Sequence, residues 1–150
     1  GEIMYNHAMM MQEKYPGIKI VCMGDMNDNP TDPSMAEYLH GRELKEDVTD
    51  ADFFSPFTSM LKAGFGSLAY QGVWSIYDLI LVNNELANAN DGSFTLRTIG
   101  KNGFYGRVYK KPYMTTQKGQ YKGYPFRTFS NGSFIGGFSD HYPTYIVITK

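Results

Sequence analysis

An apolar, β-branched segment between a helix and a polar loop is the feature that most restricts the fold of this chain. Residues Ile18–Met23 (IKIVCM) have the length and composition of a strand and predict a buried central strand. The preceding segment Ile3–Tyr15 has a helix-favouring composition, and Pro16-Gly17 ends that helix. A polar loop, Gly24–Pro33, follows the strand. Because a helix leads directly into a buried strand, the pattern is typical of α/β proteins.

The rest of the chain predicts short elements. In chain order we expect helices at Ser34–Leu39 and Phe53–Leu61 and strands at Ser67–Tyr70, Val73–Ile76, Leu79–Val82, Phe94–Ile99 and Thr144–Thr149. The acidic stretch Glu43–Asp52 is expected to be a solvated face. We find no internal repeat and no linker in the 150 residues, and this length fits one domain.

Composition excludes several classes of protein. Hydrophobic residues make up 42% of the chain and charged residues 19%, which is too apolar for a disordered protein. No stretch approaches the ~20 apolar residues that a membrane span needs. The single cysteine, Cys22, excludes an internal disulfide and a multi-cysteine zinc site, and we expect it to be a buried thiol. The sequence leaves both a periplasmic or secreted location and a cytoplasmic one open.

Charge is unevenly distributed along the chain, although the formal net charge is only −1. Residues 1–91 carry fourteen acidic and five basic side chains, whereas residues 92–139 carry eight basic side chains and no acidic one. The eight are Arg97, Lys101, Arg107, Lys110, Lys111, Lys118, Lys122 and Arg127. Folded together, the two segments would place carboxylates for a metal beside cations for a phosphate. The alternative is that opposite charges sort onto different faces and aid solubility.

The loop after the first predicted strand carries Asp25 and Asn27 at the carboxyl end of that strand, where ligands bind in open α/β sheets. One residue separates them, so both side chains point to the same side if they extend the strand. Such a pair holds a hard divalent cation or orients a water molecule. The alternative is an ordinary turn, in which these residue types are common. A calcium-binding EF-hand is excluded, because its sixth and twelfth positions would be Pro30 and Ala36.

Asp78, Asp140 and His141 are the other candidate site residues. Asp78 lies in an apolar strand, where a carboxylate is costly to bury unless it is paired. His141 is its best partner, because His7 and His40 are expected on the surface. An aspartate paired with a histidine fixes the tautomer of the ring and raises its basicity. The adjacent pair Asp140-His141 has an alternative interpretation as a hydrogen-bonded turn before the last strand.

Taken together and in order, these motifs resemble the endonuclease/exonuclease/phosphatase superfamily, which has the deoxyribonuclease-I-like fold. The matching residues are Gly24-Asp25-Met26-Asn27, Tyr77–Val82 and Ser139-Asp140-His141-Tyr142-Pro143. The longer strings MGDMNDNPTDPS, GSLAYQGVWSIYDLI, YKGYPFRTF and GGFSDHYP are most similar to a Bacteroidetes branch of that family. The resemblance implies that residues 1–150 are the carboxy-terminal half of such a domain and that the amino-terminal half is missing. The implied fold is half of a four-layer α/β sandwich, with a mixed, largely antiparallel sheet and flanking helices.

The activity that this resemblance implies is metal-dependent hydrolysis of a phosphate ester, by a phosphodiesterase, a nuclease or a phosphomonoesterase. Asp25 would position or deprotonate the attacking water, and Asn27 would donate a hydrogen bond to the phosphate. His141, oriented by Asp78, would hold the phosphate or transfer a proton. One or two Mg²⁺ or Mn²⁺ ions are implied, with Asp25, Asn27 and Asp140 as ligands. The principal Glu ligand is expected in the missing half.

The basic segment would then contact the substrate. Lys122 and Arg127 would flank the site and bind phosphate groups, with the aromatic residues between them stacking on a base or sugar. The alternative for this segment is packing of a long loop. Nucleic acid, a phospholipid head group and a small phosphate all remain candidate substrates. The chain alone is expected to be incomplete as an enzyme, and the competing hypothesis is a non-catalytic binding module on the same fold.

A missing half has a physical consequence for the apolar face of the sheet. One sheet of a sandwich normally buries that face against the other sheet. We therefore expect an exposed apolar patch that binds the missing half or a second copy of the chain. The residues expected in this patch are Val21, Ile80, Val82, Ile146 and Ile148.

Overall fold

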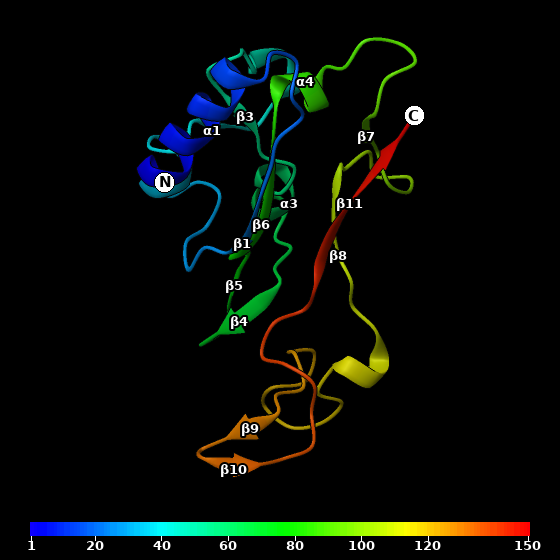
Figure 1. The fold of residues 1–150 in the computed structure, drawn as a ribbon. Helices are drawn as coiled ribbons and strands as arrows, with labels where there is room; N and C mark the ends of the chain where they lie inside the picture. Colours follow the sequence, from blue (N-terminus) through cyan, green and yellow to red (C-terminus); the bar gives the residue numbers. More distant parts are fainter.

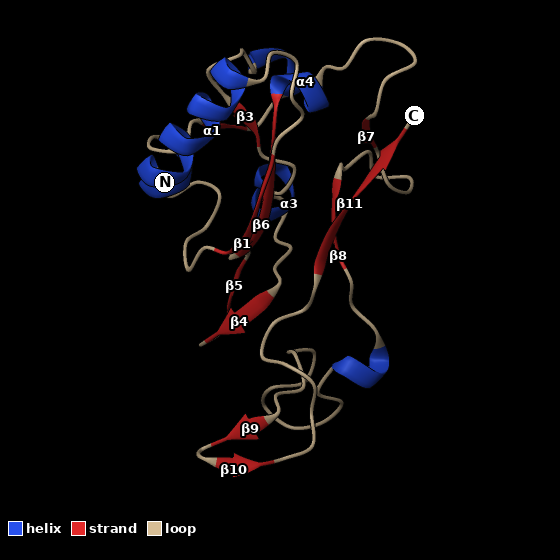
Figure 2. Ribbon diagram, in the orientation of Figure 1, coloured by secondary structure: helices blue, strands red, loops and turns tan.

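The computed structural model describes residues 1–150 as an α/β protein with mixed and antiparallel sheets (Figure 1). Figure 2 separates its helices from its strands. The helices are α1 (Glu2–Lys14), α2 (Pro33–Ala36), α3 (Thr58–Lys62) and α4 (Asn84–Ala87), with 3₁₀ turns η1 (Lys45–Asp47) and η2 (Pro112–Met114). The strands are β1 (Val21–Asp25), β2 (Gly41–Arg42), β3 (Phe53–Phe54), β4 (Leu68–Tyr70), β5 (Val73–Ser75), β6 (Asp78–Asn83), β7 (Thr95–Arg97), β8 (Gly106–Val108), β9 (Phe129–Ser130), β10 (Ser133–Phe134) and β11 (Thr144–Thr149). None of the helices combines the length and the apolar character that crossing a membrane requires.

Two sheets form the centre of the molecule. The first has the order β1-β6-β3-β2, in which only β2 and β3 run parallel, and the second has the antiparallel order β7-β11-β8. Helix α1 packs on one face of the first sheet through Ala8, and the second sheet lies on the opposite side, as Figure 1 shows. Between the sheets, Val82 of β6 and Leu96 of β7 are buried, and Ile146 of β11 packs against them.

Several predicted elements are confirmed. The last strand has the predicted bounds, and α1 differs from the predicted helix by one residue at each end. Strands β4 and β5 lie within the predicted strands Ser67–Tyr70 and Val73–Ile76 and pair as an antiparallel hairpin. Gln71 and Gly72 turn it with φ angles of +48° and +87°. Two successive positive φ angles are typical of the tight hairpin turn whose twist matches that of the strands, and glycine adopts them without strain.

The prediction of a buried central strand at Ile18–Met23 is wrong. Strand β1 begins only at Val21, extends to Asp25 and lies at the edge of its sheet. Cys22 is its one buried residue, whereas Met23 is 70% exposed. The reason is that α1 covers one face of the strand and no neighbouring strand pairs with its outer edge. Burial raises the pKa of the Cys22 thiol, as expected for an unreactive cysteine.

The helix predicted at Phe53–Leu61 is wrong in its first half. Phe53 and Phe54 form β3 and are both buried, one in each of the two core clusters. Successive side chains of a strand point to opposite faces, so this aromatic pair fills the core on both sides of the sheet. Helix α3 starts only at Thr58, beyond Pro56.

The acidic stretch Glu43–Asp52 is not entirely a solvated face, because Asp52 is buried. The guanidinium of Arg42 lies 2.7 Å from the Asp52 carboxylate, and the backbone N–H of Thr49 donates to it at 3.1 Å. Burial alone would raise the pKa of Asp52. The hydrogen bonds from Thr49 and the charge of Arg42 outweigh it and hold that pKa below its ordinary value. The prediction of a solvated face is therefore wrong for Asp52, because the sequence does not show that Arg42 and Thr49 pair with it.

The predicted apolar patch is only partly present. Val82 is fully buried, and Ile80 and Ile146 are half-buried, because the chain contains strands of both packed sheets. Val21 and Ile148 are 40% and 38% exposed. The prediction is thus wrong for Val82, and the exposed apolar groups lie along the edge strand β1 and the end of β11.

Residues 109–138 form an arm at the lower end of Figure 1, with the β9–β10 hairpin at its tip. The ammonium of Lys110 lies 4.9 Å from the ring centre of Trp74 and 5.2 Å from that of Tyr142. The Tyr142 hydroxyl lies within hydrogen-bond distance of two groups of the arm, the Thr115 hydroxyl at 2.8 Å and the carbonyl of Gly123 at 3.1 Å. These contacts anchor the arm to the residue that follows His141.

Candidate active site

Two carboxylates face each other at one end of the antiparallel pair β1–β6. Asp25 is the last residue of β1 and Asp78 the first of β6, and the strand register pairs them directly. The pairing continues one residue further, where the Met26 N–H donates to the Tyr77 carbonyl at 2.8 Å. Directly opposed residues of an antiparallel pair project from the same face, so the register itself brings the two carboxylates together.

His141 joins this pair from the loop before β11. Its Nδ1 lies 3.0 Å and 3.1 Å from the two carboxylate oxygens of Asp78, and 4.0 Å from a carboxylate oxygen of Asp25. The Thr144 hydroxyl donates to the backbone carbonyl of Asp78 at 2.8 Å, which fixes the start of β11 beside β6. One ligand atom from each of Asp25, Asp78 and His141 lies within 4.8 Å of the other two. The predicted pairing of Asp78 with His141 is therefore present in the structure.

The hydrogen bond between His141 and Asp78 determines the tautomer of the ring. An ionised carboxylate only accepts hydrogen bonds, so Nδ1 must carry the proton that it donates to Asp78. Nε2 is then an acceptor in the neutral ring and a donor in the protonated ring. The His141 side chain is 20% exposed, which leaves the ring accessible from solvent.

Ser67 completes the surroundings of Asp78 and was not identified from the sequence. Its hydroxyl donates to a carboxylate oxygen of Asp78 at 2.6 Å, and its backbone carbonyl accepts from the N–H of Tyr142 at 2.7 Å. Ser67 is fully buried and holds both the acid and the segment after His141. No sequence signal marks it, because a serine before a strand is common and its two partners are distant along the chain.

The loop after β1 combines an exposed Asn27 with residues that build the turn. Asn27 has a φ of +53°, and its backbone N–H donates to the Asp25 carboxylate at 3.0 Å. Asp32 accepts from the N–H of Asn29 at 2.8 Å, and the Asn29 side chain accepts from the N–H of Ile76 at 3.0 Å. These two residues therefore shape the loop, as the turn interpretation expects.

The remaining predicted site residues lie outside the three-residue cluster. The Asp140 carboxylate is 3.9 Å from the guanidinium of Arg127, and their side chains are 56% and 48% exposed. Lys122 is exposed on the arm and takes part in no ion pair within 4 Å. The structure thus brings Asp25, Asp78 and His141 together, and it places Asp140 with Arg127 instead.

The donor set is suited to a hard divalent cation. The Asp25 side chain is 46% exposed, and the carboxylate oxygen that does not accept from Asn27 has no protein donor within hydrogen-bond distance. Carboxylate oxygens are the ligands that Mg²⁺ and Mn²⁺ prefer. Asp78 is already occupied by Ser67 and His141. The chain therefore offers Asp25 as the open ligand and fits an ion that keeps several water molecules.

The two carboxylates and the histidine at the strand ends of this α/β fold are groups that general acid–base and metal-ion catalysis use. A family model described as the endonuclease/exonuclease/phosphatase family matches residues 2–150, and the chain belongs to this family. Family members are generally phosphoester hydrolases and commonly use divalent metal ions. No curated protein and no solved structure matches the chain.

Proposed function

We propose that the protein hydrolyses a phosphate ester with the help of a divalent metal ion, and that Asp25, Asp78 and His141 are the catalytic residues this chain supplies. The observation that carries the proposal is the convergence of these three side chains within 4.8 Å. Membership of a hydrolytic family supports the reaction class. The partial exposure of all three side chains supports access of a substrate to them.

Each residue has a role that its surroundings support. Asp78 accepts from Nδ1 of His141 and so turns Nε2 toward a substrate, where it holds the phosphate or transfers a proton. Asp25 has an accessible oxygen that positions or deprotonates the attacking water. Asn27, exposed on the loop, donates a hydrogen bond to the phosphate as negative charge develops.

Asp25, Asn27 and Asp140 would hold the Mg²⁺ or Mn²⁺ ion, together with a Glu from a preceding half of the domain. When bound, the ion polarises a phosphoryl oxygen and lowers the barrier to attack by water. Asp140 would have to leave its partner Arg127, and at 3.9 Å between two exposed side chains that ion pair is weak. An activity assay with each metal in turn identifies the ion that supports hydrolysis.

Lys122 and Arg127 would bind phosphate groups of the substrate. Both lie on the exposed arm, which carries basic side chains and no acidic one from residue 109 to residue 138. Exposed aromatic side chains accompany them, among them Tyr121 and Phe129. Such a surface suits nucleic acid, a phospholipid head group or a small phosphate, and a comparison of turnover on these three classes identifies the substrate.

We also propose that the chain is the carboxy-terminal half of its domain and that a preceding half pairs with the edge of β1. An apolar cavity of about 470 Å³ between α1 and β1 supports this, with Met4, Met11 and Ile20 among its lining residues. The exposed Met23 lies on the same edge. Hydrogen exchange of the β1 amides tests it: protection should rise when the preceding half is present. Self-association would instead protect the same amides only at high concentration of the chain.

The decisive experiment measures hydrolysis of bis(p-nitrophenyl) phosphate by the protein that contains this chain and its preceding half. We expect activity that requires Mn²⁺ or Mg²⁺ and that falls at least ~100-fold in the His141→Ala variant, the low end for a positioned proton-transfer group. The melting temperature of the variant serves as the folding control. Absence of metal-dependent hydrolysis of both diesters and monoesters, in a folded sample, would overturn the proposal and favour a binding module.

A further inference from the structure

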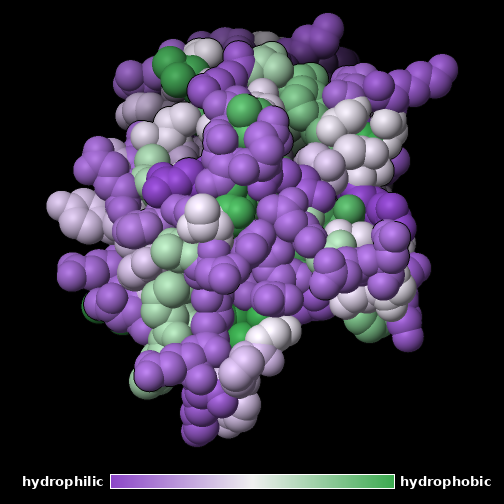
Figure 3. Space-filling view, turned by 90° about the horizontal axis from the view of Figure 1, so that it is seen from above, coloured by the Kyte–Doolittle hydropathy of each residue, from purple (hydrophilic) through white to green (hydrophobic).

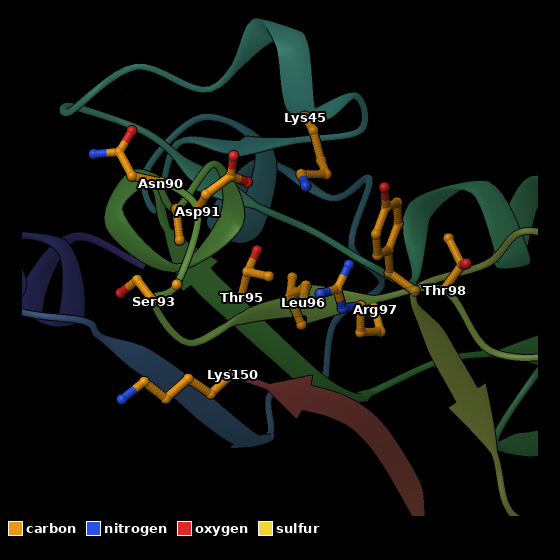
Figure 4. A pocket seen from close by; sticks show the side chains of 12 residues that line it. Lys45, Asn90, Asp91, Ser93, Thr95, Leu96, Arg97, Thr98 and Lys150 are labelled. Atoms are coloured by element: carbon orange, nitrogen blue, oxygen red, sulfur yellow. The ribbon is translucent and has the colours of Figure 1, made fainter.

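A polar cavity lies at the other end of β6 from the candidate active site and is lined by residues of η1, β7 and the loop after α4 (Figure 4). Its volume is about 340 Å³. Lys45 of η1 and Arg97 of β7 bring two cationic side chains to it, whereas the side chain of Lys150, which also lines it, extends away from these two. Asp91 is the one acidic side chain in its lining. Tyr105 forms part of the wall.

This cavity is separate from the candidate active site. Asp78 is the first residue of β6 and Asn83 the last, so the strand alone spans about 17 Å. The cavity lies beyond Asn83, past helix α4. Viewed from above, where α4 and the carboxyl terminus lie in Figure 1, the surface is mostly hydrophilic (Figure 3). A small ligand bound there could not reach His141.

The cations of the cavity lack counterions. Neither Lys45 nor Arg97 takes part in an ion pair within 4 Å, and Asp91 pairs with neither. Burial, and then the charge of Arg97, lower the pKa of Lys45. Two like charges that face one cavity and form no ion pair repel each other, and an anion placed between them would relieve that repulsion.

The packing around the cavity holds both cations in place. The ammonium of Lys45 lies 5.1 Å from the ring centre of Tyr105, and that ring packs edge-on against buried Phe54 with 5.3 Å between centroids. The Nε of Arg97 donates to the Thr149 hydroxyl at 2.8 Å, which leaves its two terminal nitrogens free. Donors fixed in advance lose little entropy when a ligand binds, so the arrangement favours binding.

We propose that this cavity is a binding site for a phosphate-type dianion, either inorganic phosphate or the terminal phosphate of a small phosphomonoester. The two free nitrogens of Arg97 match two oxygens of a phosphate, and Lys45 supplies a second charge. The volume exceeds that of a bare phosphate and leaves room for a small organic group. The site is independent of the proposed hydrolytic function, because it shares no residue with the Asp25–Asp78–His141 cluster.

The test is a titration of the ¹⁵N-labelled protein followed by nuclear magnetic resonance, with EDTA present and constant ionic strength. Inorganic phosphate in one arm and ribose 5-phosphate in the other are compared with chloride. We expect the amide signals of Gly92 and Ser93, which line the cavity, to shift saturably. Stronger binding of ribose 5-phosphate would identify the phosphomonoester as the ligand, and equal binding would identify the free phosphate group.

Matched variants separate this site from a general effect of charge. Lys45→Met and Arg97→Gln should each weaken phosphate binding about tenfold, as expected for loss of one charge-assisted hydrogen bond. Lys45→Arg should retain binding. Lys14→Met removes an exposed lysine at the end of α1 and should leave the affinity unchanged. The proposal is overturned if Gly92 and Ser93 do not shift, or if the Lys14 variant weakens binding as much as the cavity variants.

Discussion

The two ends of the β1–β6 pair use their polar side chains in opposite ways. At one end, Asp25 and Asp78 face each other with side chains 46% and 24% exposed. At the other end, Asn83 is only 1% exposed. Its side-chain oxygen accepts from a backbone N–H of the segment before β1 at 2.9 Å. Its amide nitrogen donates to a carbonyl of that segment at 2.9 Å and to the Gln12 side chain at 3.0 Å.

This difference separates a polar side chain that the fold uses completely from one that stays available to a ligand. The Asn83 side chain uses both its oxygen and its nitrogen within the protein, so it has little left to offer a ligand. Asp25 keeps an accessible oxygen beside a histidine whose orientation is fixed. A catalytic or metal site requires an acceptor oxygen that no protein donor uses, next to a side chain that is held in place. The comparison predicts that mutations at one end change stability and mutations at the other change activity.

The largest effect is expected for Asn83→Leu. The substitution removes three hydrogen bonds and leaves the N–H of Ile20 and the carbonyl of Ile18 without a partner. Because the groups of Ile18 and Ile20 are only partly buried, each lost hydrogen bond should cost about 1 kcal/mol, and the free energy of unfolding should fall by about 3 kcal/mol in urea denaturation. The activity per folded molecule should not change.

Asn84→Ala is the matched control for that experiment. The Asn84 side chain bonds to Asp50 and Asn88 on the exposed surface, so its loss should cost less than about 1 kcal/mol. Equal losses for the two asparagines would contradict the structural role given to Asn83.

The next largest effect is expected for Asp78→Asn, and it should change the activity instead of the stability. The new amide NH₂ can donate to Nδ1 of His141, which favours the tautomer with its proton on Nε2. We expect kcat to fall roughly 100-fold, equivalent to about 2.7 kcal/mol in the barrier, with a changed pH–rate profile. Thermal melting should change little.

Asp47→Asn makes the same chemical change at an exposed residue of η1 and serves as the control. It should leave both kcat and the pH–rate profile unaltered. If Asp78→Asn retained most of the activity, or lost it only through unfolding, Asp78 would not be the residue that orients His141.

The part of the site that follows from local pattern could be predicted from the sequence. Asp25 and Asp78 each lie at the end of a strand, and His141 lies three residues before the start of β11, so short-range motifs identify all three as candidates. Ser67 could not be identified, because its role depends on a contact across the site with Asp78. Asp140 lies next to His141 in the sequence, but its side chain lies near Arg127, a direction that spacing does not determine.

In the fold, too, features with a local sequence signal could be predicted, and features that depend on distant strands could not. The hairpin β4–β5 and strand β11 were predictable from turn residues and β-branched runs, because their signals are local. The edge position of β1 was not predictable, since an apolar run shows that a strand forms and does not show how many neighbours it has. The burial of Val82 depends on the second sheet, whose strands lie later in the sequence.

A third carboxylate, that of Asp52, extends the comparison, because it is buried and paired whereas that of Asp25 is exposed. Its ionised form is stabilised in the folded protein, where its pKa is held below the ordinary value of 3.8. Its contribution to stability is therefore fully present above that value and is lost as pH falls through the lower pKa of the folded state. Asp52→Asn should lower the free energy of unfolding by about 1–2 kcal/mol at pH 7.

Urea denaturation of both proteins at pH 7 and at successively lower pH checks this prediction. The two stabilities should converge in acid, because protonation of Asp52 has the same effect as its replacement by Asn. A difference that stayed constant with pH would show that packing, and not the charge, makes Asp52 stabilising.

The smallest effect is expected for Ser67→Ala, which tests how tightly Asp78 must be held. The Ser67 hydroxyl donates to Asp78 at 2.6 Å, and without it one carboxylate oxygen keeps only its bond with His141. A single hydrogen bond contributes about 0.5–1.5 kcal/mol, so kcat should fall roughly 2- to 12-fold. Ser55→Ala, a buried serine that bonds to Thr58, should leave kcat unchanged. Because Ser67 acts through Asp78, adding Ser67→Ala to Asp78→Asn should cause little further loss, and fully additive effects in this double-mutant cycle would mean that the two residues act separately.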